Sequence, residues 1–87
     1  MPYRVKLTGQ AEKSFGLIMK SQPDIGLRIA RAIESIALDP NVGVPLKGIL
    51  KGFNKYRVGS YRIIYKIHRS HLIVIVIDIG HRKEICR

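Results

Sequence analysis

Hydrophobic and polar residues follow three successive patterns in the first half of the chain. Residues 2–7 alternate between apolar and polar side chains, which is typical of a half-buried β-strand. Residues 9–20 carry apolar side chains at helical spacing and predict a first helix. They follow Thr8, a residue type that often caps the start of a helix. Residues 23–38 begin with Pro23 and repeat isoleucine every three or four positions, which predicts a second helix. We therefore expect a helical hairpin whose apolar stripe covers one face of a sheet.

Three further strands are predicted in the second half, after a glycine- and proline-containing loop at residues 41–52 that has room for one short extended piece. The strands span residues 53–58, 61–68 and 72–79. The last one is apolar at nearly every position, which is typical of a central strand covered on both faces. The predicted order is thus β-α-α-β-β-β, an α+β fold in which a mostly antiparallel twisted sheet packs against the helical hairpin. At this length, residues 1–87 are expected to form a single domain.

A two-residue turn determines how the first two of these later strands pair. Gly59 and Ser60 lie between them, and glycine at the first turn position favours a type II′ hairpin. In that register Arg57 lies directly opposite Arg62, and Lys55 shares their face. Like charges in direct opposition cost a few tenths to about 1 kcal/mol, so stability does not explain the arrangement, whereas a bound phosphodiester does. The alternative is that these side chains extend into solvent and are screened by counter-ions.

The charge of the chain points to a polyanionic partner. Sixteen lysine and arginine residues against six aspartate and glutamate residues leave a net charge of +10 on 87 residues. Residues 41–87 carry +8 of this excess, so the binding surface is expected in the C-terminal half. A nucleic-acid face and a site masked by an acidic protein both fit this distribution, as does a merely solvated basic surface.

Cysteine content and hydropathy indicate the setting in which the protein acts. The single cysteine, Cys86, cannot form an internal disulfide, which favours a reducing cytoplasm. The longest apolar stretch, within residues 72–79, is too short to cross a membrane, and the N-terminus lacks the apolar core of a signal peptide. The histidines and Cys86 do not have the dense spacing of metal ligands. We expect a cytoplasmic protein with no membrane association, no metal and no cofactor.

A second polar cluster follows the last strand, at residues 80–87. His81 is its candidate general base or acid, because imidazole titrates near neutral pH and neighbouring cations favour the neutral form. At the end of a strand, this imidazole can lie on the same face as Arg57 and Arg62. The alternative is a structural or simply exposed histidine, which is the more common case near a chain end.

Three sequence blocks carry a resemblance to a known family. They read LKG at residues 46–48, YRVGSYRIIY at residues 56–65 and IGHRKEI at residues 79–85. Together they resemble the LKG, YRVGDYRIIY and IGHRxxVY blocks of the RelE/ParE toxin superfamily, over about residues 46–86. The resemblance implies a toxin of a type II toxin-antitoxin system. The RelE branch implies a ribosome-dependent mRNA endonuclease, whereas the ParE branch implies a non-catalytic toxin that blocks a protein target such as DNA gyrase.

The resemblance to the RelE branch also implies roles for individual residues. Its nucleases use basic residues on the two hairpin strands, which align with Lys55, Arg57 and Arg62, and an arginine after the last strand, which aligns with Arg82. The implied reaction is attack by the ribose 2′-hydroxyl on the adjacent phosphorus, without a metal. The usual C-terminal tyrosine, a general base in some members, is Cys86 in this chain.

Proton transfer therefore needs another assignment. We favour His81, with Cys86 as a less favoured substitute, while loss of the tyrosine can also mark a weak or inactive nuclease. The basic residues expected to contact RNA are Lys47, Lys51, Lys55, Arg57, Arg62, Lys83 and Arg87.

The resemblance further implies a cognate antitoxin, which we expect to be acidic and partly disordered on its own. The ribosome and mRNA are the other expected partners. The four aligned basic residues favour the RelE interpretation, and the missing tyrosine slightly favours the ParE alternative.

Overall fold

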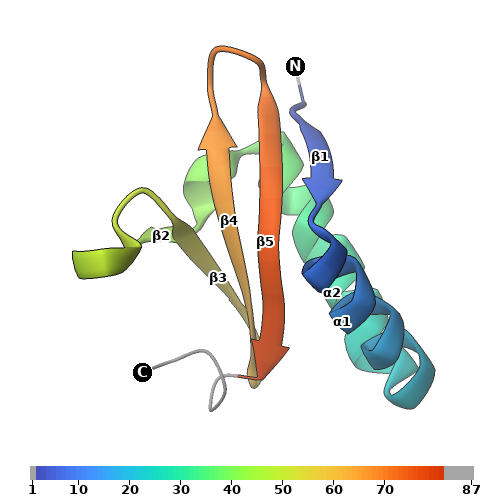
Figure 1. The fold of residues 1–87 in the computed structure, drawn as a ribbon. Helices are drawn as coiled ribbons and strands as arrows, with labels where there is room; N and C mark the ends of the chain where they lie inside the picture. Colours follow the sequence, from blue (N-terminus) through green and yellow to red (C-terminus); the bar gives the residue numbers. More distant parts are fainter. Residues whose placement is uncertain (1, 82–87) are drawn as a thin grey trace.

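The computed structural model describes residues 2–81, which fold into a five-stranded sheet and two helices (Figure 1). The regular elements are β1 (Arg4–Leu7), α1 (Gly9–Ser21), α2 (Pro23–Leu38), β2 (Val44–Pro45), β3 (Asn54–Val58), β4 (Tyr61–His68) and β5 (Ile73–His81). The predicted α+β fold and the order of the long elements are confirmed. The loop before β3 adds the two-residue strand β2 and two 3-10 turns, Pro40–Val42 and Gly48–Leu50.

The strands lie in the order β1-β5-β4-β3-β2. β1 pairs in parallel with β5, while the three other pairs are antiparallel, so the prediction of a mostly antiparallel sheet is confirmed. The first and last strands of the chain are therefore neighbours (Figure 1). β2 pairs only with Asn54 and Lys55. In the described part of the chain, the rest of β3, residues 56–58, consequently forms a free edge.

The β3-β4 hairpin has the predicted register. Gly59 adopts a φ of +58° and Ser60 does not adopt a positive φ, as a type II′ turn requires. Arg57 pairs with Arg62. The local turn signal thus places two arginines directly opposite each other.

Local sequence signals also determine where the two helices begin. Thr8 caps α1, because its Oγ1 accepts a hydrogen bond from the Ala11 N–H at 3.2 Å and donates one to the Ile77 carbonyl at 2.8 Å. α2 begins at Pro23. Proline lacks a backbone N–H, but an N–H in the first helical turn has no partner within the helix, so no helical hydrogen bond is lost. No helix within residues 2–81 has both the length and the apolar character needed to span a membrane. The Thr8 cap additionally ties the start of α1 to β5.

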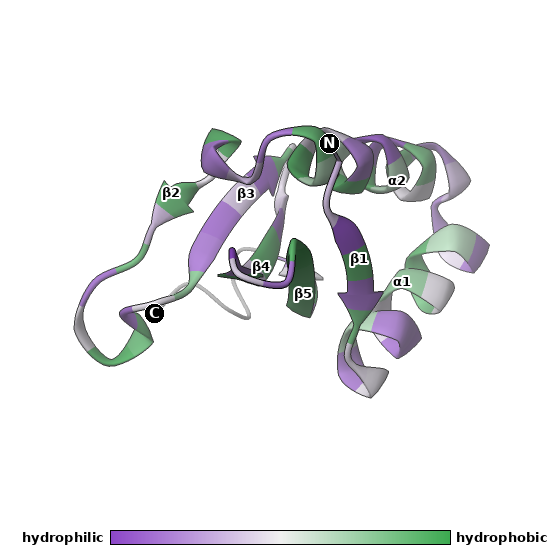
Figure 2. Cartoon of the chain, turned by 90° about the horizontal axis from the view of Figure 1, so that it is seen from above, coloured by the Kyte–Doolittle hydropathy of each residue, from purple (hydrophilic) through white to green (hydrophobic). Residues whose placement is uncertain are grey.

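Both helices cover the same face of the sheet. Their apolar stripes join β3, β4 and β5 in one buried cluster, which consists of Ala11, Ile18, Ile29, Ala32, Ile36, Val58, Ile63, Tyr65, Val74, Val76 and Ile79. Figure 2 shows that β4 and β5 are the hydrophobic strands of the sheet and that β3 is mostly hydrophilic. The other face of β5 carries the half-buried Ile73, Ile75 and Ile77. The prediction that this strand is covered on both faces is wrong for residues 2–81, because the helices occupy one face only.

A β-bulge in β5 changes which of its residues face the helices. Val76 before the bulge and Ile79 after it are both buried in the core. Between them β4 supplies only Ile64, whereas β5 supplies Ile77 and Asp78. The additional residue shifts the alternation of side chains by one position. Residues after the bulge therefore point to the face opposite to the one that a regular strand would give them.

Tyr65 holds the loop after α2 against the core. Its side chain is fully buried, and its hydroxyl donates to the Pro40 carbonyl at 2.6 Å and accepts from the Gly43 N–H at 3.0 Å. A Cβ at Gly43 would collide with this hydroxyl, so the position requires glycine. Burial raises the pKa of Tyr65 above its ordinary value, although the hydrogen bond from Gly43 acts in the opposite direction.

Candidate nucleic-acid interface

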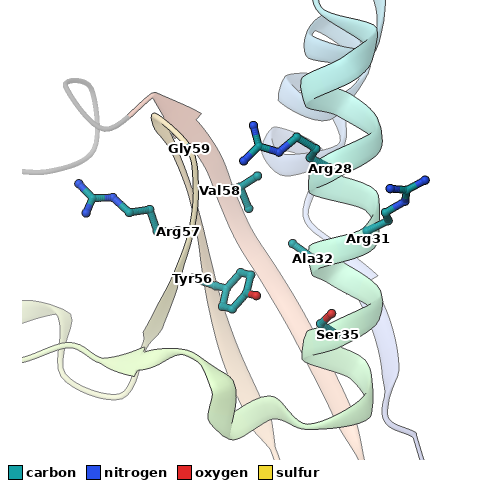
Figure 3. Close-up of a pocket in the computed structure, with 8 residues that line it drawn as sticks. All are labelled: Arg28, Arg31, Ala32, Ser35, Tyr56, Arg57, Val58 and Gly59. Carbon is teal, nitrogen blue, oxygen red and sulfur yellow. The ribbon is translucent and has the colours of Figure 1, made fainter.

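A cluster of cations lies on the sheet face that the helices leave uncovered. Arg57 on β3 pairs with Arg62 on β4, and directly opposed residues of a sheet share a face. Lys55 lies two residues before Arg57 and therefore points the same way. Figure 3 shows Arg57 directed away from α2, whereas the adjacent Val58 is directed toward it. We call Lys55, Arg57 and Arg62 the clamp.

The two arginines of the clamp differ in burial. Arg57 is exposed, whereas Arg62 is half-buried, and its Nε is inaccessible and has no hydrogen-bond acceptor within residues 2–81. Leaving a buried donor without a partner costs about 1–3 kcal/mol. Neither guanidinium forms an ion pair with a carboxylate in the same part of the chain. The pair thus combines like-charge repulsion with an unsatisfied donor, and a bound anion would offset the repulsion.

Asp78 places a carboxylate on the face of the clamp. Asp78 pairs with Ile64, and the next residue, Ile79, is buried against the helices on the opposite face. Asp78 and Arg62 are therefore diagonal neighbours on adjacent strands, a relation that separates Cα atoms by about 7–8 Å. Asp78 is not among the site residues expected from the sequence, although a lone acidic side chain in an otherwise apolar strand was an available signal.

His81 lies on the helix-covered face. It pairs with Tyr61, and the two rings meet edge to face with their centroids 5.5 Å apart. The Tyr61 hydroxyl in turn accepts a hydrogen bond from Gln22 Nε2 at 2.7 Å, beside the start of α2. The expectation that His81 shares a face with Arg57 and Arg62 is therefore wrong. The physical reason is the bulge in β5, which reverses the side-chain alternation before His81 is reached.

The other residues selected from the sequence are not brought to the clamp within the described part of the chain. Lys47 and Lys51 are exposed and flank the 3-10 turn Gly48–Leu50, at the end of β3 remote from the Gly59 turn. Residues that lie outside the described residues are Arg82, Lys83, Cys86 and Arg87. Within residues 2–81, no three histidine, cysteine, aspartate or glutamate side chains are grouped closely enough to hold a metal ion.

A second cationic region lies between α2 and β3 (Figure 3). Arg28, Arg31 and Ser35 line it from the helix, and Tyr56 and Val58 line it from the strand. The two helix arginines are not among the site residues expected from the sequence. Their spacing of three residues on α2 was the only local signal, and the neighbouring strand is distant in sequence.

Comparison with known sequences identifies the family. The family model described as "ParE toxin of type II toxin-antitoxin system, parDE" matches residues 5–86. Toxin RelG of Mycobacterium tuberculosis (strain ATCC 25618 / H37Rv) is 33% identical to this chain over 89 residues, which cover 100% of this chain and 99% of RelG.

Solved structures of related toxins have the same fold. The toxin-antitoxin complex RelBE2 from Mycobacterium tuberculosis contains a chain that matches with a TM-score of 0.83 and 30% identity, over 94% of this chain and 93% of that chain. A mutant of the E. coli toxin RelE in the free state matches with a TM-score of 0.78 at 19% identity, over 98% and 88% of the two chains. The chain therefore belongs to the ParE toxin family within the RelE/ParE superfamily, the toxins of type II toxin-antitoxin systems.

Proposed function

We propose that this toxin is a ribosome-dependent mRNA endonuclease that cleaves the phosphodiester bond without a metal and thereby inhibits translation in the cytoplasm. The observation that carries the proposal is the clamp, in which Arg57 and Arg62 oppose each other at a cost to stability. The resemblance of the hairpin sequence to the RelE branch and the 33% identity to Toxin RelG support it further.

The clamp supplies the charge that this reaction needs. The 2′-hydroxyl gives up its proton and attacks phosphorus to form a pentacoordinate phosphorane, so negative charge accumulates on the non-bridging oxygens. The P–O5′ bond then breaks, the 5′-oxygen takes up a proton from water, and a 2′,3′-cyclic phosphate remains. Guanidinium groups bind such oxygens bidentately and stabilise the added charge. Arg57 and Arg62 take this role, and Lys55 adds a third positive charge on the same face. Arg82, which lies outside the described residues, is proposed at the leaving oxygen on the resemblance alone.

Proton transfer requires a group on the face where the phosphate binds. Asp78 meets this requirement, while His81 lies on the opposite face. An ionised carboxylate accepts protons and hydrogen bonds, so we assign Asp78 as the acceptor of the 2′-hydroxyl proton. Cys86, which lies outside the described residues, is the alternative acceptor.

The same uncovered face suits a cognate antitoxin. Ile64, Ile73, Ile75 and Ile77 are half-buried isoleucines of β4 and β5 that no helix covers within residues 2–81. Apolar side chains beside cations are complementary to an acidic segment that folds on contact. The proposed antitoxin therefore inhibits by covering the clamp. Hydrogen exchange should show protection in β3 and β4 when it binds, and no protection anywhere in residues 53–81 would contradict direct masking.

A ParE-like action is the second candidate, because the matching family model is that of ParE. In that case the toxin binds a protein target such as DNA gyrase and cleaves no RNA. Its basic surface would then contact acidic groups of that target instead of phosphates.

Primer extension on translated mRNA separates the two candidates. With the endonuclease, new 5′ ends appear within the translated region, and they are absent when the same mRNA is not translated. The double variant Arg57→Ala/Arg62→Ala is the control and should produce no ends. Inhibition of DNA supercoiling by purified gyrase, without new RNA ends, would overturn the endonuclease proposal and establish the ParE-like action.

A further inference from the structure

A cleft of about 280 Å³ lies between α2 and the free edge of β3. Arg28, Arg31 and Ser35 line it at helical spacings of three and four residues, so they share one side of α2. Tyr56 forms the strand side of the cleft, with its ring turned toward the helix (Figure 3). The cleft thus offers arginine side chains, two hydroxyl groups and an aromatic ring.

The two arginines of α2 are not neutralised by neighbouring carboxylates. Asp24 precedes Arg28 by four positions and Glu34 follows Arg31 by three, which are the spacings at which helix residues form ion pairs. Within residues 2–81 neither ion pair forms. Arg28 extends toward the hairpin turn, where its Nη1 lies 3.6 Å from the position of a Cβ built on Gly59. Figure 3 shows the Arg28 guanidinium directed toward β3 and the Arg31 guanidinium directed away from it, so Arg28 is placed to bind an anion in the cleft and Arg31 adds positive charge at its rim.

The free edge of β3 connects this cleft with the clamp. Residues 56–58 have no strand on their outer side in the described part of the chain, because β2 pairs only with the start of β3. Arg57 leaves this edge toward the clamp face, whereas Tyr56 leaves it toward α2 (Figure 3). Arg57 also lines the cleft, so the cleft and the clamp meet at this residue, while Arg62 and Arg28 lie on opposite sides of the sheet. No acidic residue lies in β3.

We propose that the cleft between α2 and β3 binds a backbone phosphate of the same RNA strand, a few nucleotides away from the phosphate held by the clamp. This inference rests on the proposed endonuclease function. Arginine, serine and tyrosine are typical donors to phosphate oxygens, and an aromatic ring offers a surface on which a base can stack. An RNA strand that passes around the free edge of β3 contacts both cationic groups. The cleft therefore extends the substrate site from the uncovered face to the side of the sheet that carries α2.

Binding of RNAs of two lengths tests this arrangement. The probes are fluorescent single-stranded oligoribonucleotides, a trinucleotide that fills the clamp alone and a decanucleotide that reaches around the edge. For the double variant Arg28→Gln/Arg31→Gln, affinity for the decanucleotide should fall about tenfold, as expected for a lost charge-assisted contact. The salt dependence of log K should become shallower by about 0.7 for the one phosphate lost. Affinity for the trinucleotide should stay unchanged.

The matched control is Lys13→Gln/Lys20→Gln, which also removes two positive charges, but from exposed positions of α1. It should leave both affinities near those of the wild type, so that a general effect of net charge is excluded. Arg28→Lys/Arg31→Lys should recover part of the decanucleotide affinity, because it restores charge without the bidentate geometry. Thermal melts should show that all three variants fold.

Each result distinguishes this inference from the proposed function. If Arg57→Gln/Arg62→Gln abolishes binding of both RNAs while Arg28→Gln/Arg31→Gln binds both like the wild type, the clamp stands and the cleft inference is wrong. If Arg28→Gln/Arg31→Gln loses affinity only for a hexaglutamate peptide, the cleft binds an acidic protein segment and not RNA. Failure of the wild type to bind the decanucleotide overturns the cleft inference alone, because the proposed endonuclease meets its RNA on the ribosome.

Discussion

The helix-covered face of the sheet and the uncovered face differ in how their polar groups are satisfied. On the covered face, the buried Tyr65 hydroxyl both donates and accepts a hydrogen bond. On the uncovered face, Arg57 opposes Arg62, and the buried Arg62 Nε has no acceptor within residues 2–81. The first arrangement stabilises the fold, whereas the second destabilises it. This difference indicates that one face maintains the structure and the other serves a ligand, so variants of the two faces should separate stability from activity.

The largest expected effect is on cleavage, from loss of a clamp arginine. Arg57→Ala or Arg62→Ala should reduce cleavage of translated mRNA by about 100- to 1,000-fold, the range found when one transition-state donor is removed. The free energy of unfolding should not fall, because either substitution relieves the opposition of like charges and Arg62→Ala also removes the buried donor that has no acceptor within residues 2–81. Lys66→Ala, an exposed cation on the same strand, is the control. Variants that fold and remain fully toxic would disprove a role of the clamp in cleavage.

The second-largest expected effect is on the cleavage rate, from substitution of Asp78 on the uncovered face compared with His81 on the helix-covered face. Asp78→Asn should lower the single-turnover cleavage rate by about 100-fold, because it removes the proposed proton acceptor without changing the shape of the side chain. His81→Ala should lower the rate less than about tenfold, because the imidazole lies on the helix-covered face. An inactive His81→Ala protein beside an active Asp78→Asn protein would reverse the assignment. Cys86→Ser, measured in the same assay, tests the remaining candidate.

A change on the covered face should affect stability instead. Tyr65→Phe removes the partner of the Pro40 carbonyl and of the Gly43 N–H, and should lower the free energy of unfolding by about 1–3 kcal/mol. Urea denaturation measures this loss. At temperatures where the variant is folded, its cleavage rate should equal that of the wild type. A variant as stable as the wild type would mean that the two hydrogen bonds contribute little.

The smallest expected effect is a difference in alkaline stability. Burial raises the pKa of Tyr65 in the folded state above its unfolded value of about 10. The stability that this group contributes is therefore fully present below that pH and is lost as the pH rises through the folded pKa. Denaturation between pH 8 and pH 11 should show a steeper alkaline loss for the wild type than for Tyr65→Phe. Parallel pH profiles of the two proteins would contradict a contribution from Tyr65 ionisation.

The sequence alone was sufficient to predict the helices, the long strands and the pairing of the clamp arginines, because the signals involved are local. The two-residue turn at Gly59 specifies the hairpin register, and the register places Arg57 opposite Arg62 without knowledge of any other part of the fold. The helix that begins at Pro23 follows in the same way from isoleucine spacing within one segment. Charge and the three sequence blocks added the family to this picture.

Tertiary structure decided the position of His81 and the coverage of β5. A continuous apolar run has no visible alternation, so the sequence does not reveal that Ile77 and Asp78 together oppose a single residue of β4. That one additional residue turns His81 toward the helices and leaves Asp78 on the face of the clamp. The cleft between α2 and β3 likewise required the packed fold, because Arg28 and Tyr56 are 28 positions apart in sequence. Local patterns specify which residues pair within a hairpin, whereas the faces that distant segments share depend on bulges and packing that only the folded chain defines.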